Sequence, residues 1–116
     1  MIDISVLRDF SGGDKEFELD IVQTYIDESG YYSSLLESNF NNGNLQEVAR
    51  VAHKLKSSIS VFGLAEFHQL LNKLEEKCNQ PPVDEFLSKL VIEVLQYNED
   101  ITSEMQEIKA KITSLD

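Results

Sequence analysis

Apolar residues return every third or fourth position through the last third of this 116-residue chain, and this spacing limits the fold more than any other sequence feature. It is typical of a helix with one apolar face. A helix from Val83 to the end of the chain would be about 50 Å long, at about 1.5 Å per residue. We expect its end to overhang a bundle of shorter helices, as a dimer seam or a frayed tail. The positions that share the spacing are Leu87, Val91, Val94, Asn98, Ile101, Met105, Ile108, Ile112 and Leu115.

The rest of the chain also predicts helices and no strand, because no run of β-branched residues alternates with polar ones. Gly30 leaves open whether the second segment is one helix or two, since a glycine inside a helix costs about 1 kcal/mol. We expect an all-α single domain over residues 1–116, folded as an antiparallel four-helix bundle with a short amino-terminal capping helix. The predicted helices cover residues 3–10, 14–40, 44–62 and 64–78, with stops at Gly12-Gly13, Asn42-Gly43, Gly63 and Pro81-Pro82.

Polar residues at the predicted helix starts indicate how these helices are capped. Asp3 precedes the first apolar segment and is a typical N-cap residue. Asn44 and Glu47 have the spacing of a capping box, in which the Glu47 side chain would reach back to the N-cap. Gly63 can take the left-handed conformation that ends a helix.

The chain is strongly acidic, with 21 acidic and 10 basic side chains and a formal net charge of -11. That charge argues against nucleic acid or an anionic membrane surface as a partner. No apolar run approaches the roughly 20 residues of a membrane span, and the first residues do not resemble a secretory leader. We therefore expect a soluble, cytoplasmic protein. The lone Cys78 is expected to be a partly buried structural residue.

His53 and its neighbours form the candidate functional site. Residues three and four positions apart share a helix face, so Lys56 and Ser57 should lie beside His53, with Ser60 extending the same strip. The apolar residues of this segment lie on another side of the helix, which places His53 at the surface. Ala49, on the preceding turn, is small and leaves space for a partner.

No acidic residue occurs between Glu47 and Glu66, whereas Arg50, Lys54 and Lys56 all lie in this gap. The gap surrounds the candidate site, and we interpret it as a docking surface to which Arg50 and Lys54 contribute. The alternatives are a chance gap or a solvated basic face.

This arrangement suits a histidine that carries a phosphoryl group. A neutral imidazole can attack phosphorus, and an unperturbed pKa of about 6.5 makes the neutral form available at cellular pH. The product brings about two negative charges, which Lys56 can offset. A charge pair at about 4 Å is worth about 1 kcal/mol in water and about 4 kcal/mol at an effective dielectric of 20. Ser57 and Ser60 can donate hydrogen bonds to phosphoryl oxygens.

The sequence contains no glycine-rich phosphate loop of the GxxxxGK[ST] kind and no paired aspartates for Mg²⁺. We therefore predict a phosphoryl carrier and not an enzyme, with no metal site or cofactor of its own. The nucleotide site or the magnesium-binding aspartates would belong to a partner domain.

Residues 53–58 read His-Lys-Leu-Lys-Ser-Ser, and Gly63 follows ten positions after the histidine. The chain resembles, over nearly its whole length, the histidine-containing phosphotransfer (HPt) domains of multistep two-component relays, whose motif is His-x-Leu-Lys-Gly-Ser with a later glycine. Ser57 stands where that family usually has glycine. The resemblance implies that His53 is phosphorylated on Nε2 by a receiver-domain aspartyl phosphate, or donates to one, while Lys56 steadies the phosphoryl group. It also implies that the partners are response-regulator receiver domains or a hybrid sensor histidine kinase, and that the receiver holds Mg²⁺.

Two other classes of function remain as alternatives. The first is a non-phosphorylated helical adaptor, or pseudo-HPt domain, that binds receiver domains or other partners without exchanging phosphoryl groups. The second is a metal-dependent bundle enzyme, which would need inward carboxylates and histidines that the sequence does not provide.

Overall fold

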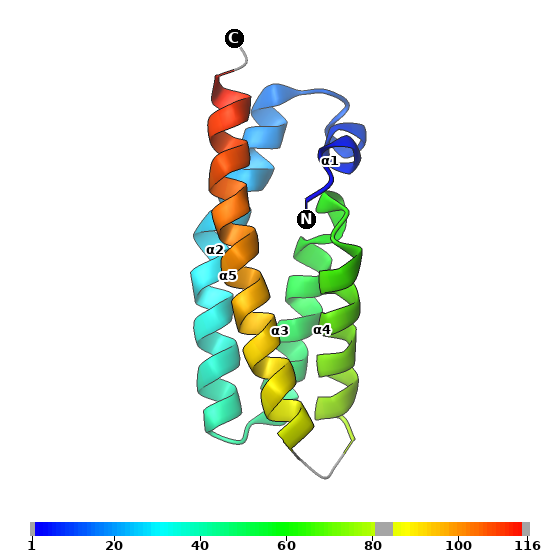
Figure 1. Cartoon of the computed structure of the whole chain (residues 1–116), viewed down its shortest axis with the longest axis vertical. Helices are drawn as coiled ribbons and strands as arrows, with labels where there is room; N and C mark the ends of the chain where they lie inside the picture. The colour runs from blue at the N-terminus through cyan, green and yellow to red at the C-terminus, as the bar shows by residue number, and fades with distance from the viewer. Residues whose placement is uncertain (1, 81–84, 115–116) are drawn as a thin grey trace.

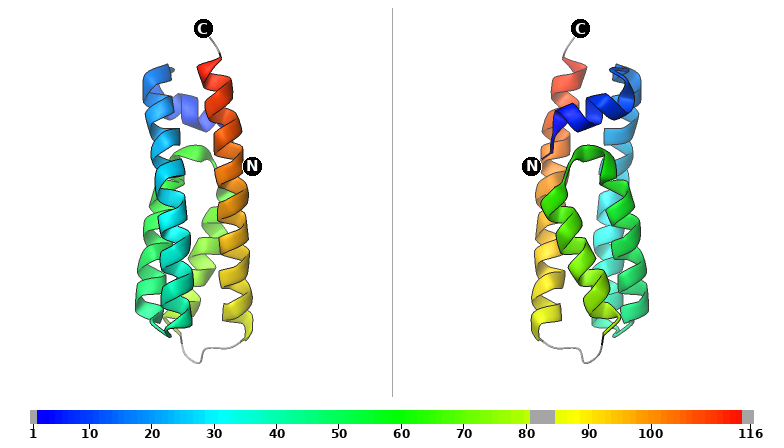
Figure 2. Two further views of the ribbon diagram at one scale, coloured as in Figure 1. Left: turned by 90° about the vertical axis from the view of Figure 1, so that its left-hand side faces the viewer. Right: turned by 90° about the vertical axis from the view of Figure 1, so that its right-hand side faces the viewer.

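The chain folds into a bundle of antiparallel helices about 52 × 21 × 18 Å in extent (Figures 1 and 2). The computed structural model describes residues 2–80 and 85–114, and within these residues it contains helices and no strand. Each of the four main helices packs against the next in the chain, and the last closes the ring against the first. This confirms the predicted all-α bundle. The elements are α1 (Ile4–Ser11), α2 (Lys15–Asn41), α3 (Leu45–Ser58), the 3-10 helix η1 (Ser60–Phe62), α4 (Ala65–Cys78) and α5 (Glu85–Thr113).

The core lies where the apolar faces of the four helices meet. Every position of the repeat that the structure describes in α5 is buried, Asn98 included. The inward residues of the two shorter helices are Val48, Val51, Ala52 and Leu55 on α3 and Phe67, Leu71 and Leu74 on α4, all at most 1% exposed. The helical spacing in the sequence therefore predicted which side of α3, α4 and α5 faces the core, whereas at the start of α2 Phe17 is exposed and Glu18 and Val22 are buried instead.

The helices α2 and α5 are the longest, and both extend past the ends of α3 and α4 (Figure 1). Gly30 lies within one continuous α2 helix, which resolves the open question about that segment. The end of α5 extends past the shorter helices as predicted, but it is not bare, because α2 runs beside it and α1 lies at the same end (Figures 1 and 2). Met105, Ile108 and Ile112 are accordingly buried there. The predicted helix stop at Pro81-Pro82, the start at Val83 and the last repeat position, Leu115, lie outside the described residues.

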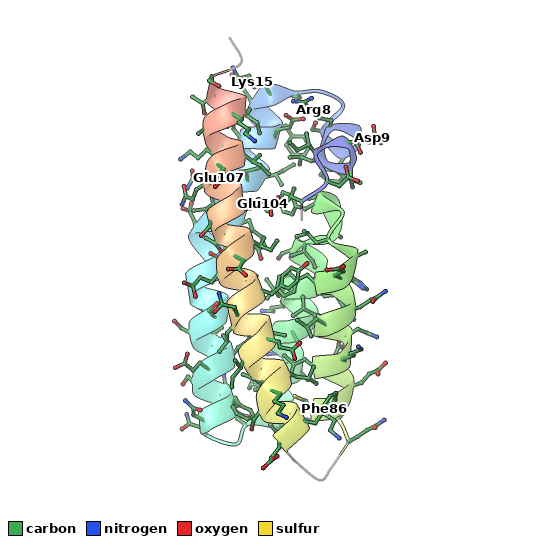
Figure 3. All side chains as sticks on the ribbon, in the orientation of Figure 1. Arg8, Asp9, Lys15, Phe86, Glu104 and Glu107 are labelled. Atoms are coloured by element: carbon green, nitrogen blue, oxygen red, sulfur yellow. The ribbon has the colours of Figure 1, made fainter. Side chains whose placement is uncertain are left out.

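The short helix α1 is attached to the rest of the fold by backbone hydrogen bonds. Asp3 caps it, as predicted, by accepting from the Ser5 backbone N at 3.0 Å. The Asp3 backbone N donates to the Phe62 carbonyl oxygen at 2.8 Å, which ties α1 to η1. The Ile2 backbone N donates to Oε1 of Glu104, labelled on α5 in Figure 3, at 3.0 Å. These contacts hold α1 over the end of the bundle.

The turn after η1 requires glycine for two reasons. Gly63 has a φ of 67°, the left-handed conformation predicted for a helix stop. A Cβ at this position would also lie 2.7 Å from Asp3 Cβ and 3.1 Å from Val6 Cγ2. The close approach to α1 gives the motif glycine a packing role that the sequence did not predict.

A buried polar cluster connects α2 to α5. The Tyr25 hydroxyl donates to Asn98 Oδ1, and Asn98 Nδ2 donates to the Ser29 carbonyl oxygen at 3.1 Å and to Ser33 Oγ at 2.8 Å. Burial raises the pKa of Tyr25 above its usual range, so the hydroxyl keeps its proton and remains a donor. All the polar groups of Asn98 that lie in the core are therefore paired.

Both ends of α3 differ in detail from the prediction. Asn44 occupies the N-cap position, but its side chain makes no capping hydrogen bond. The predicted capping box is wrong: the Glu47 side chain does not reach back to the N-cap but pairs with Arg50, whose Nη2 lies 2.6 Å from Glu47 Oε2. The α-helix ends at Ser58, and the tighter η1 turn carries the chain to Phe62.

Candidate functional site

His53 lies in the middle of α3 with its side chain 63% exposed. Its neighbours Ala52 and Leu55 face the core, which turns the imidazole outward as predicted. The ring is held at one nitrogen: Nδ1 lies 3.1 Å from Oε1 of Glu75, on α4. Nε2 makes no hydrogen bond to any residue that the structure describes.

Glu75 joins His53 to Lys56. Its second oxygen, Oε2, accepts from Lys56 Nζ at 2.9 Å, and the same ammonium group donates to Asn72 Oδ1 at 3.2 Å. Both ends of the ion pair are partly buried, with the Lys56 side chain 17% and the Glu75 side chain 24% exposed. Burial raises the pKa of the Glu75 carboxyl, but the hydrogen bonds and charges of Lys56 and His53 outweigh it and hold this pKa below its usual range. One ionised carboxylate therefore contacts both predicted site residues.

The gap in acidic residues along the sequence does not produce an acid-free surface in space. Glu75 comes from the neighbouring helix to within hydrogen-bond distance of His53. Lys56, expected to stand ready for an incoming anion, already has a carboxylate partner. Glu75 and Asn72 were not predicted as site residues, because the packing of α4 against α3 leaves no local spacing signal in the sequence.

The hydroxyl groups of the two serines of the predicted strip bond to the backbone. Ser57 Oγ donates to the His53 carbonyl oxygen at 3.3 Å, and Ser60 Oγ donates to the Ser57 carbonyl oxygen at 2.8 Å. Ser60 belongs to η1 and not to α3, so the helical spacing that placed it on the same strip does not apply. Both hydroxyls are exposed and can rotate toward another acceptor.

The other predicted docking residues divide into exposed and buried groups. Arg50 and Lys54 are exposed, and they line a pocket of about 200 Å³ together with Tyr31 and Tyr32 of α2. Ala49 is only 8% exposed. It therefore offers a partner little surface, and its expected role of leaving space for a partner stays a prediction.

A larger apolar pocket lies where α1, α2 and the end of α3 meet. Its volume is about 330 Å³, and its lining includes Phe10, Phe17, Ser58 and Val61. The Phe10 and Phe17 rings, whose centroids are 5.7 Å apart, are both exposed. Ser58 is five residues beyond His53, about 7.5 Å along the helix. This apolar surface was not predicted from the sequence.

The described residues contain no group of three or more histidine, cysteine, aspartate or glutamate side chains that could hold a metal ion. Cys78 is partly buried, as expected, and burial raises its pKa to about 11, so the thiol stays protonated near neutral pH. No helix in the described part of the chain is both long and apolar enough to cross a membrane.

The fold and the site define a helical-bundle module that carries an exposed histidine on α3, one of its two shorter main helices. A family model for the Hpt domain matches residues 20–111, and the chain therefore belongs to the Hpt domain family. The structure is similar to that of the HPT domain from the Hpt sensor hybrid histidine kinase from Shewanella, with a TM-score of 0.82. The two share 12% identity over 95% of this chain and 94% of that one, a level at which the likeness concerns the fold alone. No curated protein sequence matches the chain.

Hpt domains are phosphocarrier modules of two-component phosphorelays, and this chain is such a module in that general sense. Family membership also implies receiver domains and kinases as the general class of partner. The family match assigns no role to any individual residue, so the roles of His53 and its neighbours have to be argued from the geometry of the site.

Proposed function

We propose that His53 accepts a phosphoryl group on Nε2 from the aspartyl phosphate of a receiver domain and passes it to the aspartate of another. The supporting observation is that Glu75 occupies Nδ1 of an exposed imidazole while Nε2 makes no hydrogen bond to a described residue. In the accepting step the Nε2 lone pair forms the N–P bond, and the receiver carboxylate leaves with the electrons of the broken P–O bond. The donating step is the reverse.

Glu75 supports the accepting step through the proton on Nδ1. A carboxylate can only accept, so the tautomer that fits this hydrogen bond carries its proton on Nδ1 and leaves the Nε2 lone pair available. As the N–P bond forms, the ring becomes positively charged, and the adjacent carboxylate stabilises that charge. His53 would therefore enter the reaction already in its nucleophilic tautomer.

Lys56 is proposed to stabilise the phosphoryl oxygens after transfer. Its ammonium group lies one helical turn from His53 and already reaches toward the same carboxylate that binds the ring. To contact the phosphoryl group it would exchange part of its pairing with Glu75 for the new anion. The module would need no cofactor of its own, and Mg²⁺ would be held by the receiver.

The proposed docking surface surrounds His53 and continues onto the apolar pocket beside α1. Arg50 and Lys54 would meet acidic groups of the receiver, and Ser57 and Ser60 would lie close to the phosphoryl group. Phe10 of α1 supplies exposed apolar area in the pocket that also includes Ser58, at the carboxyl end of α3. The cytoplasmic location expected from the sequence stays a prediction.

The test of the carrier role is incubation of the purified protein with receiver domains carrying a labelled aspartyl phosphate. We expect wild type to gain an acid-labile, base-stable label and His53→Gln to gain none. His68→Gln is the matched control, because His68 is the other histidine of the chain and is also exposed. Binding of receivers without any label on wild type would support the adaptor alternative instead.

The docking surface is tested with a second pair of variants. Phe10 and Phe86 are almost equally exposed, at 54% and 53%, but α1 lies at the opposite end of the bundle from Phe86 (Figure 3). We expect Phe10→Ser to weaken binding to the exchanging receiver at least fivefold, and Phe86→Ser to leave it unchanged. Equal affinities for the two variants would remove the apolar pocket from the docking surface.

A further inference from the structure

The contacts of Glu75 bear on how the phosphoryl group leaves His53, a step that the carrier role requires but does not explain. If the proposed function holds, phosphorylation of Nε2 leaves Nδ1 as the only ring nitrogen that can hold a proton. The phosphoryl group is then bound either to a protonated, positively charged ring or to a neutral one. These two forms differ greatly as phosphoryl donors, because the first releases neutral imidazole and the second would have to release an imidazole anion.

We propose that Glu75 retains the proton on Nδ1 of the phosphorylated ring, so that His53 departs as a neutral imidazole when the receiver aspartate attacks. In that step the aspartate oxygen forms the new O–P bond, the N–P bond breaks, and its electron pair returns to Nε2. The proton stays on Nδ1, hydrogen-bonded to Glu75, and no other acid or base has to act on the ring.

The geometry places the carboxylate correctly for this role. Glu75 Oε1 is 3.1 Å from Nδ1, which leaves Nε2, the nitrogen that would carry the phosphoryl group, free of this contact. The residue is less than one-quarter exposed, so bulk water screens its charge only in part. Its pKa lies below the usual range, which keeps it ionised at the pH where the relay works.

Other charged groups near the ring modify this effect without reversing it. On α3 they are Arg50 and Lys54, which are exposed, with Arg50 paired to Glu47. On α4, among the residues that the structure describes, the charged group within hydrogen-bond distance of the ring is the Glu75 carboxylate. Lys56 neutralises part of the Glu75 charge before phosphorylation.

Lys56 makes the effect depend on the phosphorylation state. Once the phosphoryl group is present, the ammonium group has a stronger anion to bind and its pairing with Glu75 weakens. The carboxylate then acts more fully on the Nδ1 proton. Lys56 and Glu75 would thus favour the tautomer with a free Nε2 before transfer and keep the proton on Nδ1 after it.

The test is the pH dependence of phosphoryl donation by Glu75→Gln, which keeps a side chain that can accept from Nδ1–H but removes the charge. The phosphorylated protein is mixed with the receiver that exchanges with it, and the transfer rate is followed from about pH 6 to pH 9. Loss of a neighbouring charge shifts a pKa by about 1 unit or more. We expect the fall in rate at high pH to occur about 1 pH unit lower in the variant than in wild type.

Glu76→Gln is the matched control, because it removes the same charge from the next position of α4. Glu76 is exposed, and its carboxylate accepts from Asn72 Nδ2 and not from the His53 ring. Its pH profile should match that of wild type. Nitrogen NMR of the phosphorylated ring should show the Nδ1 titration moving in parallel with the rates, independently of any receiver.

The inference and the proposed function can fail separately. If wild type takes up no label, the carrier role itself is overturned. If wild type exchanges phosphoryl groups but the Glu75→Gln profile and Nδ1 titration coincide with those of wild type, or move to higher pH, Glu75 does not retain the proton. A circular dichroism spectrum and melting curve of each variant establish that the bundle is folded.

Discussion

Replacing Gly63 with alanine tests whether the motif glycine is needed for its close contact with α1 as well as for its backbone conformation. A Cβ at this position would lie 2.7 Å from Asp3 Cβ, a distance that side-chain rotation cannot relieve, because both atoms are attached directly to the backbone. The chain would have to move, and the hydrogen bond from Asp3 N to the Phe62 carbonyl oxygen lies in the same contact.

The expected cost has two parts. An alanine in the left-handed region costs about 1 to 2 kcal/mol, of which roughly half is recovered because the unfolded chain has less freedom than with glycine. Overpacking of a close contact adds about 1 to 3 kcal/mol. We therefore expect Gly63→Ala to lower the free energy of unfolding by about 2 to 4 kcal/mol.

Gly43→Ala is the matched control for the first part alone. Gly43 has a φ of 72°, close to that of Gly63, but a Cβ there would meet nothing within 4 Å. Its expected cost is about 1 kcal/mol. With a urea m value of about 2 kcal/mol per molar, the midpoint of Gly63→Ala should lie about 0.5 to 1.5 M below that of Gly43→Ala.

Urea unfolding followed by circular dichroism at 222 nm measures both midpoints and both slopes. Equal losses of stability in the two variants would refute the reasoning, since they would leave only the backbone conformation to explain the glycine. A changed slope in one variant would show that the two-state comparison does not apply to it.

Three further perturbations test the core and the site. Leu55→Ala should lower the free energy of unfolding by about 2 to 5 kcal/mol, because Leu55 is fully buried, and an unchanged melting temperature would contradict its place in the core. Asn98→Ala leaves the Tyr25 hydroxyl in the core without its acceptor and should cost about 1 to 3 kcal/mol for each buried group that loses its partner; Tyr25→Ala made in the same background should then cost less than it does in wild type. The pKa of Glu75 is lower in the folded chain than in the unfolded one, so its contribution to stability is present above the ordinary glutamate pKa and is lost as the pH falls through the lowered value. The melting temperature of Glu75→Gln should therefore fall less steeply than that of wild type below about pH 5, and parallel curves would exclude the contribution.

The helices and their buried faces could be predicted from the sequence because each depends on local spacing. Every described position of the repeat predicted in α5 is buried, although Leu90 is buried as well and was not among them, and Asp3 and Gly63 were correctly placed at helix ends. Local spacing did not predict the contact where two partners compete for one side chain. Glu47 fits a capping box by spacing, but a guanidinium three residues away binds the same carboxylate.

The site could be predicted only in part, for a similar reason. His53 and Lys56 lie one turn apart, and their shared face follows from the helix alone. Glu75 lies 22 residues from His53, on a different helix, and its contact depends on how α3 and α4 are aligned. The sequence did not predict that α2 covers the end of α5, although the two helices, of 27 and 29 residues, are nearly equally long.

The alignment of α2 with α5 has a consequence for the bundle as a whole. A seam of regularly repeated apolar residues is nearly as well packed after one helix slides along the other by a turn, about 5.4 Å. The amide of Asn98 can satisfy all its hydrogen bonds at one setting only, where it meets the Tyr25 hydroxyl, the Ser29 carbonyl and the Ser33 hydroxyl together. We expect Asn98 to fix the register of α2 against α5, by favouring one of several alignments that would otherwise have similar energy.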